Sequence, residues 1–154
     1  MSDARINIHG TAIVIGTLGV LFNGPSGSGK SMLAFACMVA ARRQGVFSAL
    51  ISDDQVLVSG DDGRITASRP ESIAGLIELR GSGIVAIESV ASAALDLAVS
   101  VISLPQAERL PPENERFDIA GLGSVPLVRL WNGALEPLAT LAALVPDLQG
   151  EVRF

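Results

Sequence analysis

One segment constrains the fold of this chain more than any other, because its eight residues match the phosphate-binding pattern G-x-x-x-x-G-K-[ST] at every fixed position. In order they are Gly24, Pro25, Ser26, Gly27, Ser28, Gly29, Lys30 and Ser31. Such a loop joins a buried strand to a helix, and its backbone N–H groups surround the phosphates of a nucleotide. The flanking sequence agrees, since an apolar run at 20–23 precedes the loop and a helical pattern follows from Met32 to Gln44.

Two side chains of the loop are suited to phosphate chemistry. Lys30 is the only lysine in the chain, and at this position its ammonium group is expected to neutralise the β- and γ-phosphates. The hydroxyl of Ser31 is expected to bind Mg²⁺. The sequence therefore predicts binding of a nucleoside triphosphate and leaves the reaction open.

Composition narrows the class of protein. A length of 154 residues, 49% of them hydrophobic, predicts one domain with a single aliphatic core. The net charge of −5 argues against binding to nucleic acid. Glu88 and Asp96 interrupt the apolar stretch 84–104, which argues against a membrane span. Because the start of the chain is polar and Cys37 is the lone cysteine, expected in the core, we predict a cytoplasmic protein.

The hydrophobic pattern predicts alternating strands and helices. Strands are expected at 6–8, 11–15, 18–23, 47–52, 55–59, 64–68, 73–79, 84–87, 97–104 and 125–130. Helices are expected at 32–44, 91–96 and 135–144, and a polar loop at 105–124. The turn at 60–63 predicts a hairpin between its flanking strands, so we expect a mixed sheet rather than a purely parallel one.

A pair of acids, Asp53 and Asp54, directly follows the apolar strand expected at 47–52. Acids at the end of a strand that neighbours the loop's own strand would lie close to the γ-phosphate and its metal. One carboxylate is therefore a candidate Mg²⁺ ligand and the other a candidate general base.

Four further residues are candidates for a role in phosphoryl transfer. Glu78 and Arg80 lie two residues apart, which places an acid and a base on one face of a strand just before a glycine-rich turn. His9 is the only histidine and stands between two expected strands. Arg109 lies in the polar loop, where a guanidinium group could stabilise transition-state charge.

These pieces, in this order, resemble the catalytic domain of HPr kinase/phosphorylase. The matching residues are His9-Gly10, the loop 24–31, Asp53-Asp54, Glu78-Leu79-Arg80-Gly81-Ser82-Gly83-Ile84 and Arg109-Leu110. The resemblance covers roughly 9–130 and implies a single catalytic domain over 1–154. It implies an α/β fold with a P-loop kinase-type mixed β-sheet flanked by helices, similar to the nucleotide-binding domain of phosphoenolpyruvate carboxykinase. It also implies ATP and Mg²⁺ as cofactors, the HPr phosphocarrier protein of the sugar phosphotransferase system as substrate, and a homo-oligomer, often a hexamer.

The resemblance also implies roles for the candidate residues. Asp54 corresponds to the acceptor of the substrate serine proton, with Asp53 assisting. Lys30 corresponds to a phosphate contact, and the residues that serve the metal are Ser31, Glu78 and Asp53. Arg80 joins the loop 24–31 in binding the nucleotide. His9 and Arg109 correspond to further active-site positions.

The chain departs from this pattern after its last expected strand. A Pro-rich, basic segment that the family associates with phosphate-dependent dephosphorylation has no good match, and Trp131 to Ala134 stand there instead. Met32 also replaces an acid that usually follows the loop serine. The sequence thus favours a serine kinase and leaves the phosphorylase reaction without support. Two alternatives stay open: a P-loop kinase of a small metabolite, and a non-enzymatic ATP-binding sensor.

Overall fold

The computed structural model describes residues 5–104 and 110–152. Its strands are β1 (Ile6–Ile15), β2 (Leu18–Asn23), β3 (Ser48–Asp61), β4 (Arg64–Ser68), β5 (Leu76–Leu79), β6 (Gly83–Ala86), β7 (Ser92–Ala94), β8 (Leu97–Ile102), β9 (Arg116–Ile119) and β10 (Gly123–Trp131). Its helices are α1 (Lys30–Arg43), α2 (Pro137–Leu144) and α3 (Pro146–Gln149), with a 3-10 helix at Glu71–Ile73. None of the helices described is long and apolar enough to cross a membrane.

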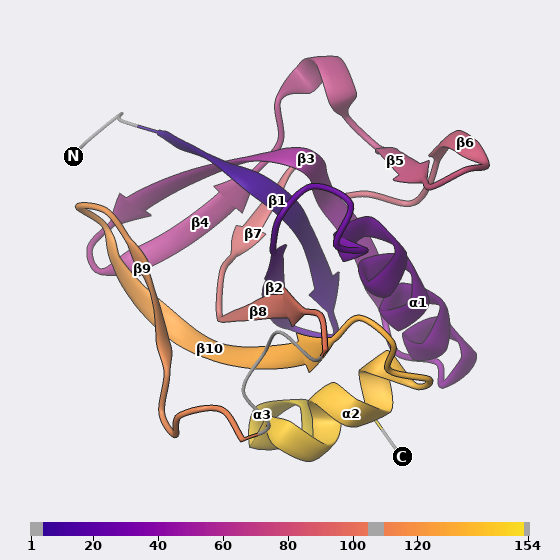
Figure 1. The fold of residues 1–154 in the computed structure, drawn as a ribbon. Coiled ribbons are helices and arrows are strands. Elements are labelled where there is room, and N and C mark those ends of the chain that lie inside the picture. The colour runs from indigo at the N-terminus through magenta and orange to yellow at the C-terminus, as the bar shows by residue number, and fades with distance from the viewer. Residues whose placement is uncertain (1–4, 105–109, 153–154) are drawn as a thin grey trace.

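Eight strands form one mixed sheet in the order β7-β4-β3-β1-β2-β8-β10-β9. The pairs β2–β8 and β8–β10 are parallel, whereas the other neighbours are antiparallel. The remaining strands, β5 and β6, form a separate hairpin that projects beside the N-terminal end of α1 (Figure 1). The mixed sheet predicted from the sequence is therefore confirmed, and its parallel part lies on one side of β2.

Both faces of the sheet are buried, because its strands alternate between two hydrophobic clusters. On β1, Ile13 and Ile15 pack with α1 and α2, whereas Ala12 and Val14 belong to a cluster on the opposite face. Helices cover the first face (Figure 1). The second face is closed by curvature of the sheet, since the β9–β10 turn meets the β3–β4 hairpin where Leu122 packs over Gly60.

Several strands are longer than the sequence indicated. The expected strands at 6–8 and 11–15 are one strand, β1, and those at 47–52 and 55–59 merge into β3, which begins at Ser48. Gly10 does not interrupt β1; a Cβ at this position would lie 2.8 Å from the carbonyl oxygen of Phe22, so the glycine permits close approach of two strands. Pairing between β1 and β3 runs along most of both strands, with one register shift between Ala12 and Ile13, and it outweighs the local break signals.

Four other expectations differ from the structure. The expected helix at 91–96 is β7, because Ser92 to Ala94 pair with β4 and this pairing overrides helix propensity. The expected loop at 105–124 contains β9, which pairs with β10. The strand expected at 73–79 begins only at Leu76, and a 3-10 helix precedes it. The last helix begins at Pro137, and α3 follows it unpredicted.

Cys37 lies on the buried face of α1 and belongs to the core, as predicted. Burial raises the pKa of its thiol from 9.0 to about 12. Because the folded-state pKa is the higher one, ionisation of this thiol does not affect the free energy of unfolding below pH 9 and lowers it progressively as the pH rises from there toward 12.

We expect a thiol-specific reagent at pH 8 to label Cys37 only after denaturation. Fast labelling of the native protein at this pH would contradict the burial of the thiol.

Candidate active site

The phosphate-binding loop connects β2 to α1, as the sequence predicts. Gly29 precedes the helix with φ 101°, and Gly27 has φ 79°, so both occupy backbone conformations that favour glycine. A Cβ on Gly24 would lie 2.9 Å from Ser28 Oγ and 3.2 Å from the Val101 carbonyl oxygen. The glycines therefore allow a close-packed loop with the first turn of α1 directly behind it.

Lys30 lies within this loop, with only 8% of its surface exposed. Its ammonium nitrogen donates hydrogen bonds to the carbonyl oxygens of Gly24 (3.0 Å) and Pro25 (3.2 Å). A positive charge is thus held at the loop by groups that phosphate oxygens could replace. Among the residues described, none hydrogen-bonds to Ser28 Oγ, which is buried within the same loop.

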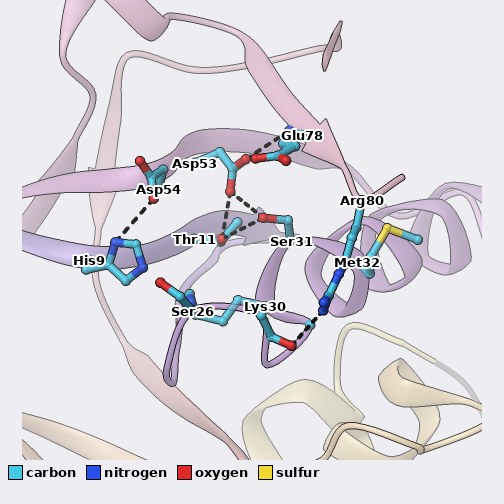
Figure 2. Close-up of a pocket in the computed structure, with 12 residues that line it drawn as sticks. His9, Thr11, Ser26, Lys30, Ser31, Met32, Asp53, Asp54, Glu78 and Arg80 are labelled. Carbon is cyan, nitrogen blue, oxygen red and sulfur yellow. Dashed lines mark hydrogen bonds and ion pairs between the residues drawn. The ribbon is translucent and has the colours of Figure 1, made fainter. Parts of the chain in front are cut away.

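Asp53 connects the loop to three other elements. Its Oδ1 accepts hydrogen bonds from Ser31 Oγ (2.6 Å) and Thr11 Oγ1 (2.8 Å), and its Oδ2 accepts one from the backbone N–H of Glu78 (2.9 Å). Figure 2 shows this carboxylate, which belongs to β3, between Ser31 of α1, Thr11 of β1 and Glu78 of β5. Because Asp53 is only 7% exposed, these three donors are what makes burial of its charge tolerable.

The two acids do not end a strand, which corrects the sequence-based expectation. Asp53 and Asp54 lie inside β3, which pairs with β1 rather than with β2. Successive residues of a regular strand point to opposite faces. Asp54, however, has φ 71°, and this left-handed conformation breaks the alternation, so both carboxylates line one cleft.

Asp54 forms a pair with His9 at the mouth of this cleft. The distance between His9 Nδ1 and Asp54 Oδ1 is 3.2 Å, and the two side chains are 51% and 67% exposed. His9 lies within β1, not between two strands as the sequence suggested. A partly exposed carboxylate next to an imidazole can accept a proton from a molecule that approaches from solvent.

Glu78 and Arg80 come from the projecting hairpin. Glu78 lies in β5, but Arg80 lies just beyond its end, so the two residues do not share a strand face as expected. The guanidinium group of Arg80 donates a hydrogen bond of 2.7 Å to the Gly27 carbonyl oxygen (Figure 2). The hairpin is therefore attached to the site through this bond and the bond from the Glu78 N–H to Asp53.

All these groups surround one cleft of about 310 Å³. Its lining residues are His9, Thr11, Ser26, Gly27, Gly29, Lys30, Ser31, Met32, Asp53, Asp54, Glu78 and Arg80. The predicted Gly24, Pro25 and Ser28 shape the loop without lining the cleft, and Arg109 lies outside the described residues. Sequence reasoning missed Thr11, whose only available signal was its position two residues after His9 on the same strand.

The donor set fits a magnesium–nucleotide complex better than a metal bound by protein alone. Within 5–104 and 110–152, no group of three or more His, Cys, Asp or Glu side chains could hold a metal ion. Mg²⁺ commonly binds through one or two protein oxygens, water and substrate phosphates. The Ser31 hydroxyl, held by Asp53 beside the loop, is suited to that arrangement.

The fold and this loop define a P-loop protein with a mixed α/β sheet. The chain belongs to the family of the HPr serine kinase C-terminal domain, whose model matches residues 2–126. Its fold is that of the Hpr(Ser) kinase/phosphatase from Coxiella burnetii, with a TM-score of 0.75 at 23% sequence identity over 94% of this chain and 96% of that one.

Curated relatives agree with this assignment. The chain is 30% identical to the HPr kinase/phosphorylase of Clostridium kluyveri over 96% of its own length, and 29% identical to that of Clostridium botulinum over 75%. It spans 48% and 39% of the length of these two relatives.

Proposed function

We propose that this chain is an ATP- and Mg²⁺-dependent serine kinase that phosphorylates the HPr phosphocarrier protein, and so regulates a phosphotransferase system. The observation that carries the proposal is the connection between the two halves of the cleft. Asp53 binds Ser31 of the phosphate loop, and the next residue, Asp54, faces solvent beside His9. The phosphate-binding part of the cleft and its proton-accepting part are therefore joined through two adjacent residues of β3.

In the proposed reaction, Asp54 accepts the proton of the serine hydroxyl, and the neighbouring His9 orients its carboxylate. Mg²⁺–ATP would supply the γ-phosphoryl group, with ADP as the leaving group, and the metal would offset the negative charge that develops during transfer. Lys30 contributes its charge at the phosphate loop. Ser31 and Glu78 would hold the metal, with Asp53 fixing the Ser31 hydroxyl, and Arg80 would contact the nucleotide.

The proposal also covers the domain organisation, the location and the oligomeric state of the enzyme. We expect 1–154 to act as one catalytic domain of the phosphoenolpyruvate carboxykinase-like P-loop type, supported by the loop between β2 and α1. We also expect a cytoplasmic homo-oligomer, a hexamer by resemblance to the family. Arg109 is proposed as a further catalytic residue on the same ground.

A phosphorylation assay with purified HPr tests the proposal. With ATP and Mg²⁺, labelled phosphate is expected on a serine of HPr, and a second reaction with phosphorylated HPr and inorganic phosphate measures the reverse direction. Transfer to a small hydroxyl compound but not to HPr would make the chain a metabolite kinase. Binding of ATP with no transfer to any acceptor would make it a sensor.

A further inference from the structure

The cleft described above provides for phosphates and an acceptor, but not for a nucleoside. Its lining residues come from β1, β3, the β5–β6 hairpin and the phosphate loop with the start of α1. Strands β8 and β10, which continue the sheet on the other side of β2, contribute no lining residue among those described. If a nucleotide binds here, as the proposed function requires, its base lies elsewhere.

The order of the strands gives the direction of the nucleotide. Asp54 and His9 place the acceptor over β3 and β1, on one side of the loop. The nucleoside, at the opposite end of the phosphate chain, is then directed over β8 and β10. These two strands are parallel to β2, so their carboxyl ends lie at the same edge of the sheet as the loop (Figure 1). Ligands of α/β sheets bind at such edges.

At this edge, the turn that follows β10 is joined to the phosphate loop. The Asn132 amide donates hydrogen bonds to the Ser28 carbonyl oxygen (3.4 Å) and to Ser103 Oγ (2.9 Å). Its backbone N–H donates to the Ile102 carbonyl oxygen at the end of β8 (2.9 Å). The turn therefore occupies a fixed position next to the loop.

This turn presents an aromatic ring. Trp131 is 46% exposed, and a Cβ on Gly133 would lie 2.5 to 2.9 Å from three atoms of its indole, so the glycine backbone packs directly against the ring. Leu135, four residues further along the chain, is 95% exposed, and Leu104, two residues beyond the end of β8, is 49% exposed. Exposed apolar and aromatic side chains beside a phosphate site are suited to an uncharged heterocycle.

We propose that Trp131, in the turn anchored by Asn132, forms the base-binding subsite, with its indole stacked on the base of the nucleotide whose phosphates occupy the 24–31 loop. This inference rests on the proposed nucleotide binding and adds where the base is bound. Stacking on Trp131 should not discriminate between the bases, because every base has an aromatic face. Different nucleoside triphosphates should therefore bind with similar affinity.

Trp131 is the only tryptophan in the chain, so its fluorescence reports on this subsite directly. In the wild-type protein with Mg²⁺, ATP is expected to quench the tryptophan emission. Inorganic tripolyphosphate, which carries the phosphates without a base, is expected to bind without quenching. Equal quenching by both compounds would contradict stacking, because it would show a general response to occupation of the loop.

Calorimetric titrations of variants supply the second test. Trp131→Ala is expected to weaken ATP binding roughly 5- to 150-fold, the range for removing one base-stacking aromatic, and to leave tripolyphosphate binding unchanged. Trp131→Phe, which keeps a ring, should retain most of the affinity. Phe47→Ala removes another half-exposed aromatic ring, in the connection between α1 and β3, and serves as the control.

The outcomes separate this inference from the proposed function. Unchanged ATP affinity in Trp131→Ala, or an equal loss for ATP and tripolyphosphate, overturns the base subsite while leaving the phosphate site in place. A wild-type protein that binds neither compound overturns nucleotide binding itself, and the subsite with it. A lower mass for Trp131→Ala than for wild type in sedimentation would place Trp131 in a contact between copies of the chain and overturn the base subsite.

Discussion

Asp54→Asn is expected to lower the rate of phosphoryl transfer roughly 10²- to 10⁴-fold, the usual contribution of general acid–base catalysis. Asparagine cannot accept a proton from the serine hydroxyl. It does tolerate the left-handed backbone at this position, where φ is 71°, so the strand should keep its shape. Nucleotide affinity should change little, because Asp53 and not Asp54 binds Ser31. Single-turnover transfer to HPr and calorimetric titration with ATP measure the two quantities.

The chain offers a matched control for this variant. Asp62 is exposed, lies in the turn between β3 and β4, and also has a positive φ, 51°. Asp62→Asn therefore makes the same chemical change in the same backbone conformation, away from the cleft, and should keep full activity. A fully active Asp54→Asn protein would rule out Asp54 as the proton acceptor. An equal loss in both variants would indicate a general effect of the substitution.

Lys30→Met is expected to give the largest loss of nucleotide affinity. Methionine is of similar length but carries no charge or donor, so the hydrogen bonds that the ammonium group can make to phosphate oxygens disappear. Hydrogen bonds to charged groups contribute about 1.5–3 kcal/mol each. Loss of two corresponds to a decrease in affinity of roughly 100-fold or more. Titration with ATP and with tripolyphosphate should show similar losses, since Lys30 lies at the phosphates.

Removal of a positive charge must be separated from removal of this particular lysine. Arg64→Met changes the net charge by the same amount on β4, at an exposed position outside the cleft. ATP affinity is expected to be unaffected by it. Comparable losses in Lys30→Met and Arg64→Met would mean that binding depends on overall charge and not on the loop. Unfolding curves should show that both variants fold, with some loss of stability for Lys30→Met alone, because methionine keeps the stem packed but cannot donate to the Gly24 and Pro25 carbonyl oxygens.

Local chemistry made the loop, α1 and the β3–β4 hairpin predictable. The glycines and Lys30 define the loop, and the turn at 60–63 sets the hairpin. The segment 91–96 could not be assigned, because its alanines favour a helix and only pairing with β4 makes Ser92 to Ala94 a strand. Such pairing joins residues far apart in the chain, so no local pattern records it.

The residues of the candidate site were likewise predictable from local sequence, whereas their arrangement was not. His9, the loop, both acids and the Glu78 segment were selected from the sequence, and the structure brings them to one cleft. Their geometry was not accessible, because it depends on the register that places Thr11 opposite Asp53 and on the unusual φ of Asp54. A threonine in an apolar strand has no local signal of function. Asn132 was missed because its contact with Ser28 spans 104 residues of sequence.

The shared carboxylate of Asp53 has a consequence for engineering. Because this one side chain accepts hydrogen bonds from Thr11, Ser31 and the Glu78 backbone, the positions around it cannot be varied one at a time without disturbing the others. Asp54 and His9, by contrast, are more than half exposed and contact each other. A library aimed at a new acceptor should leave the Asp53 network, Asp54 and His9 intact and vary the other exposed residues at the outer surface of the cleft. Retargeting would then be separable from folding.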